Sequence, residues 1–135
     1  MANIFPIHVC FLRLGDDDFP KDFGMMKVTL RDLNLSGNNL TTLPPSLLGL
    51  SGLRNLFIGA NRLLRLPRGI NQLKRLKVFY LGGNCLRQLP EEIGQLSHLV
   101  ALILSDNLLD CLPDSLSDLK KLQCLQIHKN RFTTE

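Results

Sequence analysis

The chain has 135 residues and a mass of 15.2 kDa, which suits one small domain and leaves no room for a second. Hydrophobic residues make up 44% and charged residues 21%, so the chain can bury a core and does not have the composition of a disordered one. The net charge of +4 is too small by itself to indicate a nucleic-acid-binding protein.

The cysteines and the N-terminus indicate a cellular compartment. The four cysteines are far apart and form no CxxC pair, which argues against a zinc site and against a dense disulfide framework. They are Cys10, Cys85, Cys111 and Cys124. The stretch from Ile4 to Leu14 is apolar, but it lacks the basic region and the cleavage site of a secretion signal. We therefore expect a cytoplasmic protein with no metal, no cofactor and no membrane span.

The segment 1–29 has no regular pattern of its own. Phe19 and Pro20, followed by Phe23 and Met26, mimic the second half of the repeat described next, one residue out of phase. Terminal repeats need a cap, so this segment is predicted to be a degenerate N-terminal cap or a partial repeat.

From residue 30 onward, one pattern of constant length returns without an insertion. Its first leucine is found at Leu30, Leu53, Leu76, Leu99 and Leu122. An asparagine follows later in each repeat, at Asn38, Asn61, Asn84, Asn107 and Asn130. A Leu-Pro pair follows in four repeats, at Leu43-Pro44, Leu66-Pro67, Leu89-Pro90 and Leu112-Pro113. The predicted repeats are 30–52, 53–75, 76–98 and 99–121, with a partial repeat at 122–135.

Each repeat is predicted to form one strand and one return segment. In the L-x-L part, alternation with a period of two turns Leu33 and Leu35 inward and Asn34 outward. The later L-P-x-x-L-x-x-L part has apolar residues three to four apart, which indicates a short helical or 3₁₀ return. One coil cannot bury its own leucines, so stacked neighbours must bury them.

The full pattern, L-x-x-L-x-L-x-x-N-x-L-x-x-L-P, resembles the leucine-rich repeat family over residues 30–135. It is similar to the 23-residue class found in intracellular scaffold and Ras-pathway proteins. The resemblance implies an α/β leucine-rich-repeat solenoid. Such a solenoid is a curved arc with short parallel strands on its concave face, and with 3₁₀, helical or extended returns on its convex face.

The repeated asparagine has a predicted structural role. Its side chain carries two donors and an acceptor, so it can pair backbone groups that the turn after each strand leaves open. Stacked repeats would place these asparagines in a ladder along the solenoid, formed by Asn38, Asn61, Asn84, Asn107 and Asn130.

The outward strand positions form the candidate partner-binding site. Phe57, Tyr80 and Ile103 are expected side by side and exposed, because other residues already supply the core. We expect these three to anchor a protein partner. The residues expected to set specificity are Asn55, Val78, Ser105, Asp106 and Gln126. The alternative is a set of surface apolar residues covered by the curvature of the sheet.

Basic residues dominate the middle of the chain. Between Arg54 and Arg87 there are eight basic residues and no acidic one. Arg31, Arg54 and Lys77 share one column beside the strands, and with Arg75 they would form a rim that steers an acidic partner. The alternative is a solvated face. Nucleic-acid binding is not expected, because the basic residues are divided between two sides and the rim is short.

One residue pair suggests chemistry, but a catalytic site is not expected. Cys124 and His128 fall at outward positions of the last repeat, and a thiol near an imidazole is a pattern of nucleophilic catalysis. No acidic residue of that strand completes a triad. The simpler interpretation is two unrelated side chains on an exposed face, so we predict that the protein is not an enzyme.

The sequence therefore predicts a non-catalytic protein–protein interaction module. The resemblance implies a scaffold or adaptor in intracellular signalling, with a small-GTPase pathway component as a candidate partner. A substrate-recruiting subunit of a ubiquitin ligase is an alternative, although no F-box is visible. A further alternative is a truncated structural fragment of a longer leucine-rich repeat protein, because the fifth repeat stops after Phe132 and Glu135 stands where the next leucine would fall.

Overall fold

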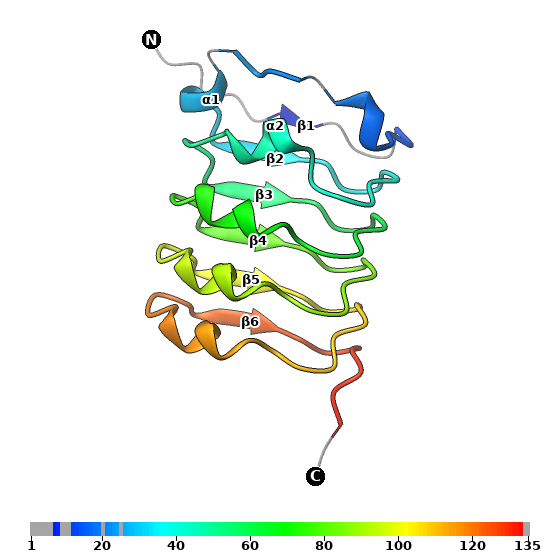
Figure 1. Cartoon of the computed structure of the whole chain (residues 1–135), viewed down its shortest axis with the longest axis vertical. Coiled ribbons are helices and arrows are strands. Elements are labelled where there is room, and N and C mark those ends of the chain that lie inside the picture. Colours follow the sequence, from blue (N-terminus) through cyan, green and yellow to red (C-terminus); the bar gives the residue numbers. More distant parts are fainter. Residues whose placement is uncertain (1–6, 9–11, 20, 25, 134–135) are drawn as a thin grey trace.

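The computed structural model describes residues 7–8, 12–19, 21–24 and 26–133. Six short strands form one parallel sheet in chain order and are stacked along the length of the molecule (Figure 1). They are β1 (Ile7–His8), β2 (Asp32–Asn34), β3 (Asn55–Phe57), β4 (Val78–Tyr80), β5 (Ala101–Ile103) and β6 (Cys124–Gln126). The predicted α/β solenoid is confirmed. Cys10, Pro20 and Glu135, which several sequence-based predictions mention, lie outside the described residues.

The register of the sheet follows the repeat length. Leu33 pairs with Leu56, and Leu56 pairs with Phe79, so each partner occupies the same position in the next repeat. β1 also pairs with β2 in parallel, but Ile7 faces Leu33, whereas a constant repeat length would place Leu30 there. The first coil is thus three residues longer than the others, so the segment 1–29 does not keep the repeat length of the later coils.

Short helical segments return the chain on the other side of the sheet (Figure 1). Two are α-helical, α1 (Met26–Thr29) and α2 (Pro45–Leu48). Four are 3₁₀ segments, η1 (Asp16–Asp18), η2 (Arg68–Gln72), η3 (Glu91–Gln95) and η4 (Asp114–Asp118). Pro67, Pro90 and Pro113 are extended residues directly before η2, η3 and η4. Proline fixes the entry to each segment and lacks the N–H that the first turn would leave unpaired.

The core consists of equivalent leucines from successive coils. Leu53, Leu56, Leu99 and Leu102 are fully buried, and Phe79 takes the place of a leucine in the middle of the stack with 0% exposure. Each of these side chains lies between the coil before it and the coil after it. The last coil, around β6, has a neighbour on one side among the described residues, and Leu125 is 39% exposed there.

The repeated asparagines form a hydrogen-bonded ladder through the turns that follow the strands. Asn84 is typical: its Oδ1 accepts from the Leu63 amide at 3.0 Å. Its Nδ2 donates to the carbonyl oxygens of Ile58 at 3.0 Å and Leu81 at 2.9 Å. The same three kinds of bond recur at Asn61, Asn107 and Asn130. One side chain therefore ties the turn of its own coil to the preceding coil.

The N-terminal coil is joined to the first regular repeat by polar contacts. The Asn38 Oδ1 accepts from the amides of Leu12 and Leu14 at 3.2 and 3.1 Å. The Asp16 carboxylate accepts from the Thr41 amide at 2.9 Å, from the Thr41 hydroxyl and from the Thr42 amide. Partial burial alone would raise the pKa of Asp16, but these hydrogen bonds outweigh it and hold the pKa below its ordinary value of 3.8.

Candidate functional site

Three columns of side chains face the concave side of the sheet. Alternation along each strand places the third and fifth residues of a repeat there. The ladder of backbone hydrogen bonds continues beyond the strands, since the Ala60 amide donates to the Gly82 carbonyl at 2.9 Å and the Asp106 amide donates to the His128 carbonyl at 3.0 Å. The seventh residue therefore faces the same side. This third column is Ser36, Gly59, Gly82, Ser105 and His128.

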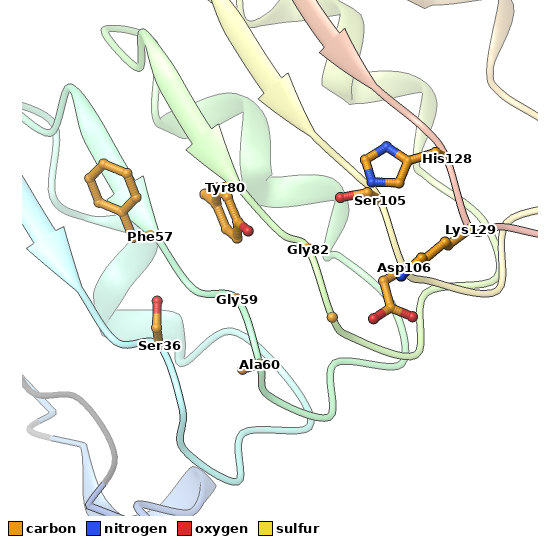
Figure 2. A pocket seen from close by; sticks show the side chains of 11 residues that line it. Ser36, Phe57, Gly59, Ala60, Tyr80, Gly82, Ser105, Asp106, His128 and Lys129 are labelled. Atoms are coloured by element: carbon orange, nitrogen blue, oxygen red, sulfur yellow. The ribbon is translucent and has the colours of Figure 1, made fainter.

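A hollow of about 550 Å³ lies over the carboxyl ends of the strands (Figure 2). We name it the aromatic hollow, because Phe57 and Tyr80 stand at one side of it. Its lining residues are Ser36, Phe57, Gly59, Ala60, Tyr80, Gly82, Gly83, Ser105, Asp106, His128 and Lys129. Two aromatic rings, a glycine floor and charged groups at the far side form a concave surface of the kind that binds protein side chains.

The Tyr80 ring lies over the backbone of two glycines. A Cβ atom at Gly59 would be 2.6 Å from the Tyr80 Cε1, and one at Gly82 would be 3.2 Å from it. The same Cβ atom would be 2.9 Å from the Gly82 carbonyl oxygen, so any larger residue at Gly59 would displace both the ring and the backbone of the next coil. The Tyr80 and Phe57 rings are inclined at 36° with their centroids 6.4 Å apart, a separation at which aromatic pairs attract. Tyr80 remains 40% exposed and is available to a partner.

The floor ends at a column of residues in the left-handed backbone conformation. The eighth residue of every repeat has a positive φ, between 51° and 73°. These residues are Gly37, Ala60, Gly83, Asp106 and Lys129. Asp106 and Lys129 adopt a conformation that non-glycine residues rarely take. Their charged side chains border the aromatic hollow, opposite the two rings (Figure 2).

The predicted stripe of three apolar residues is formed only in part. Phe57, Tyr80 and Ile103 do lie side by side, because they are paired across β3, β4 and β5. Ile103, however, is only 7% exposed, so the expectation of an exposed side chain there is wrong. Ile103 is paired with Tyr80 on β4 and with Gln126 on β6, each about one strand spacing away. The curvature of the sheet brings side chains on its concave side together, which accounts for the low exposure of Ile103.

The residues predicted to set specificity fall in different places. Ser105 and Asp106 border the aromatic hollow, but Ser105 is 7% exposed. Val78 is half-buried and Gln126 is exposed on the neighbouring strands. The Asn55 side-chain Nδ2 donates to the Asp32 carboxylate on the adjacent strand, which occupies part of the hydrogen-bonding capacity of the Asn55 side chain.

The residues of the predicted basic rim differ in what their side chains contact. The Arg31 Nη1 donates to the carbonyl oxygens of Val28 at 2.8 Å and Gly52 at 3.2 Å. A Cβ atom at residue 52 would lie 2.3 Å from this nitrogen, so the glycine makes room for the guanidinium group. Arg31 lies beside Arg54 in the predicted column, since the Arg54 amide donates to the Arg31 carbonyl at 2.8 Å, but its guanidinium group is bound to backbone carbonyls. Arg54, Arg75 and Lys77 are exposed.

The structure separates the two residues that suggested nucleophilic catalysis. Cys124 begins β6, whereas His128 follows its end and borders the aromatic hollow. Four residues of extended chain span about 13 Å, too far for a thiol and an imidazole to share a proton. Within the described residues, no three histidine, cysteine or acidic side chains are grouped so as to hold a metal ion. In the same part of the chain, no helix has the length and apolar character needed to cross a membrane.

At the seventh and eighth positions of the repeat, the sequence-based prediction named Ser105 and Asp106 but not their equivalents in the other repeats. Gly59, Gly82, His128 and Lys129 at those positions also line the aromatic hollow. Two signals were available in the sequence. The alternation can be continued two residues beyond L-x-L, and the seventh position holds small residues in four of five repeats.

Comparison with known families identifies the repeat. A sequence model of the leucine rich repeat matches residues 51–109, and a second one matches residues 29–50. The chain belongs to the leucine-rich repeat family. Members of this family are generally non-catalytic modules that bind other proteins. No curated protein matches the sequence.

Several solved leucine-rich repeat structures have a similar fold. A plant peptide hormone receptor, RGFR1 in complex with RGF2, is 33% identical with a TM-score of 0.70, over 87% of this chain and 18% of that one. The ectodomain of the Arabidopsis thaliana receptor kinase SOBIR1 is 26% identical with a TM-score of 0.67, over 78% and 59%. An internalin of Listeria monocytogenes is 27% identical with a TM-score of 0.69, over 79% and 31%. The present chain thus matches less than two thirds of each of these proteins.

Proposed function

We propose that this leucine-rich repeat chain is a non-catalytic protein-interaction module that binds a segment of a partner protein in the aromatic hollow. One observation carries the proposal: the Tyr80 ring is 40% exposed and is held over the Gly59 and Gly82 backbone within a hollow of about 550 Å³. A tyrosine that already has its position loses little conformational entropy when a partner docks. Aromatic residues in such places dominate binding energies.

Two further features support a peptide-like partner. The floor of the hollow is backbone at Gly59 and Gly82 with the Tyr80 ring lying over it, so a partner meets an ordered ring rather than flexible side chains. Asp106, His128 and Lys129 at the far side supply charged or polar groups that can fix the orientation of a segment. One of the similar solved structures is itself a peptide hormone receptor in complex with RGF2.

The proposed setting is a cytoplasmic scaffold or adaptor in signalling, with a component of a small-GTPase pathway as the partner. The support is the regular repeat pattern and the scattered cysteines, which suit a reducing compartment. Two similar solved structures are receptor ectodomains, so the compartment needs its own test. Fractionation of cells that express the chain checks it, and recovery in the secreted fraction contradicts this setting.

The central proposal is tested by capture from cytosol with a matched set of variants. Phe57→Ala/Tyr80→Ala removes both rings, and Gly59→Ala keeps the Tyr80 ring but displaces it together with the adjoining Gly82 backbone. Leu64→Ala is the control, because Leu64 is 58% exposed and does not line the hollow. We expect the first two variants to lose a protein that the wild type and Leu64→Ala retain, with equal circular dichroism spectra. Unchanged capture by the double variant contradicts the proposal.

A further inference from the structure

A second hollow, of about 260 Å³, lies near the amino ends of β3 and β4 and is lined only by Arg54, Arg75, Lys77 and His98. We name it the basic hollow. We propose that it binds the phosphate group of a phosphorylated side chain in a partner polypeptide. That a polypeptide carries the phosphate rests on the proposed function, because this polypeptide is the segment proposed to occupy the concave face. That the hollow binds phosphate is argued from the four lining residues and their arrangement alone.

The repeat brings these four residues together as a two-by-two array. Arg54 and Lys77 are the second residues of successive repeats, and Arg75 and His98 are the last residues of successive repeats. The Lys77 amide donates to the Arg54 carbonyl at 2.7 Å, so their backbones lie one strand spacing apart, about 4.8 Å. The neighbouring coils add no residue to the lining of this hollow. Arg31 is bound to backbone carbonyls, Gly52 and Val100 carry no charge, and Lys121, the last residue of the next repeat, does not line the hollow.

The array holds cations that no carboxylate neutralises in the part of the chain that the structure describes. The ion pair formed among the described residues joins Lys27 and Asp22, which lie in the N-terminal coil, away from this hollow. Two guanidinium groups and one ammonium group therefore border one hollow, and all three side chains are exposed. Their mutual repulsion is relieved when an anion enters, which gives the hollow a preference for highly charged anions.

His98 has a defined orientation at the fourth corner. Its Nδ1 lies 3.1 Å from the Lys74 carbonyl oxygen, and because a carbonyl only accepts, the Nδ1 carries the hydrogen. This bond fixes the plane of the ring and leaves the Nε2 free of that contact. The array is thus partly ordered before a ligand arrives.

Phosphate fits this set of groups better than a single carboxylate does. A phosphate monoester carries a charge of about −1.5 to −2 at neutral pH and offers three acceptor oxygens. Arginine binds such oxygens with two parallel N–H donors, and clusters of arginine are a recurring way to recognise phosphorylated segments. The volume of about 260 Å³ is several times the roughly 30 Å³ that one water molecule occupies in the liquid.

The position of the basic hollow favours a polypeptide as the carrier of the phosphate. Lys77 directly precedes β4, which contains Tyr80. Three residues of strand span about 10 Å, so a short extended segment reaches from the basic hollow to the Tyr80 ring. One ligand can therefore occupy the two hollows at once, which raises its affinity without new contacts.

The first experiment tests the site with inorganic phosphate alone. Phosphate is titrated into ¹⁵N-labelled protein and compared with chloride at equal ionic strength. We expect saturable shifts of the amides of Arg54, Arg75, Lys77 and His98, and at least a ten-fold loss of affinity in Arg54→Gln/Lys77→Gln. Arg62→Gln/Arg65→Gln removes the same charge from exposed residues outside the hollow and should leave the affinity unchanged. No local shifts, or equal losses in both variants, would overturn the proposal.

The second experiment identifies the carrier. Degenerate peptides with a central phosphoserine, phosphothreonine or phosphotyrosine are compared with their unphosphorylated forms, and with vesicles that contain phosphatidylinositol phosphates. We expect at least ten-fold tighter binding to phosphorylated peptides, lost in Arg54→Gln/Lys77→Gln and kept in Arg62→Gln/Arg65→Gln. Equal binding of the two peptide sets, or binding to vesicles alone, overturns the proposal.

Tyr80→Ala separates a failure of this inference from a failure of the proposed function. The variant should weaken peptide binding while inorganic phosphate still binds with unchanged affinity. If phosphopeptides bind through Arg54 and Lys77 with no contribution from Tyr80, the aromatic hollow is not the docking site, but the phosphate site stands. If Tyr80 contributes and phosphorylation has no effect, the phosphate site is refuted and the proposed function stands.

Discussion

The fourth and fifth repeats present the same residues in different surroundings. Leu102 on β5 and Leu125 on β6 occupy equivalent, directly paired positions, yet Leu102 is fully buried and Leu125 is 39% exposed. Asn107 is 5% exposed, whereas the equivalent Asn130 is half-buried. The difference shows that a coil of this solenoid does not bury its own apolar residues. Burial comes from the coils on either side.

The N-terminal coil provides a second contrast. It covers the first regular repeat with few leucines, and it relies on the hydrogen bonds of Asn38 and Asp16 described above. Phe23 is its one described side chain in the buried core, with 9% exposure. Hydrogen bonds therefore help to hold the N-terminal coil against its neighbour, whereas stacked leucines hold the middle coils together.

The largest expected effect comes from truncating equivalent leucines. Leu102→Ala removes a side chain with neighbours on both sides and should lower the free energy of unfolding by about 3–5 kcal/mol. Leu125→Ala removes a side chain that is 39% exposed and should cost about 1 kcal/mol. Urea denaturation followed by circular dichroism measures both. Similar losses in the two variants would contradict the conclusion that neighbouring coils supply the burial.

The asparagine ladder should show the same contrast at a smaller size. Asn84→Ala leaves the Leu63 amide and two carbonyl groups without their partner in a buried turn, at a cost of about 3 kcal/mol. Asn130→Ala removes equivalent bonds, but water reaches this half-buried turn, so the cost should be about 1 kcal/mol. Denaturation midpoints test the difference, with Asn39→Ala as the control, because Asn39 is an exposed asparagine of the first repeat outside the ladder.

The N-terminal coil should depend on pH through Asp16. The folded pKa of Asp16 lies below its ordinary value of 3.8, so the stabilisation is complete above that value and is lost as the pH falls through the folded pKa. Asp16→Ala should cost about 1 kcal/mol at neutral pH and nothing at the acid end. Asp17→Ala is the matched control on the same segment. A loss for Asp16→Ala that persists unchanged at low pH would contradict the role of its charge.

The smallest expected effect is on the reactivity of Cys111 in the fourth repeat. This thiol is exposed, whereas that of Cys85 in the middle of the stack is half-buried, so exposure alone would make Cys111 the more reactive. A hydrogen bond with Asp110 raises the pKa of Cys111 and reduces its thiolate fraction. Asp110→Asn should therefore speed alkylation of Cys111 severalfold at neutral pH, as followed by mass spectrometry. An unchanged rate would show that solvent exposure alone sets the reactivity of the Cys111 thiol.

The candidate site was predictable where it depends on strand register. Constant repeat length placed Phe57 beside Tyr80, and the structure pairs them. The prediction of exposure failed at Ile103, and the bonds of Arg31 to backbone carbonyls were not predicted, for one reason. Whether a side chain at an outward position is exposed depends on neighbours that lie one repeat away in the sequence, and on which backbone groups lie within its reach.

The amino-acid sequence by itself determined the length of the coil, the register of the sheet, the inward leucines and the position of each asparagine, because all of these follow from local periodicity. Stacking of the coils decided the rest. It buried Leu102 and left Leu125 partly exposed, laid the Tyr80 ring over two glycines, and gathered four basic side chains around one hollow. Burial, close approach and clustering of charge are properties of neighbouring chain segments, and only the folded solenoid makes those segments neighbours.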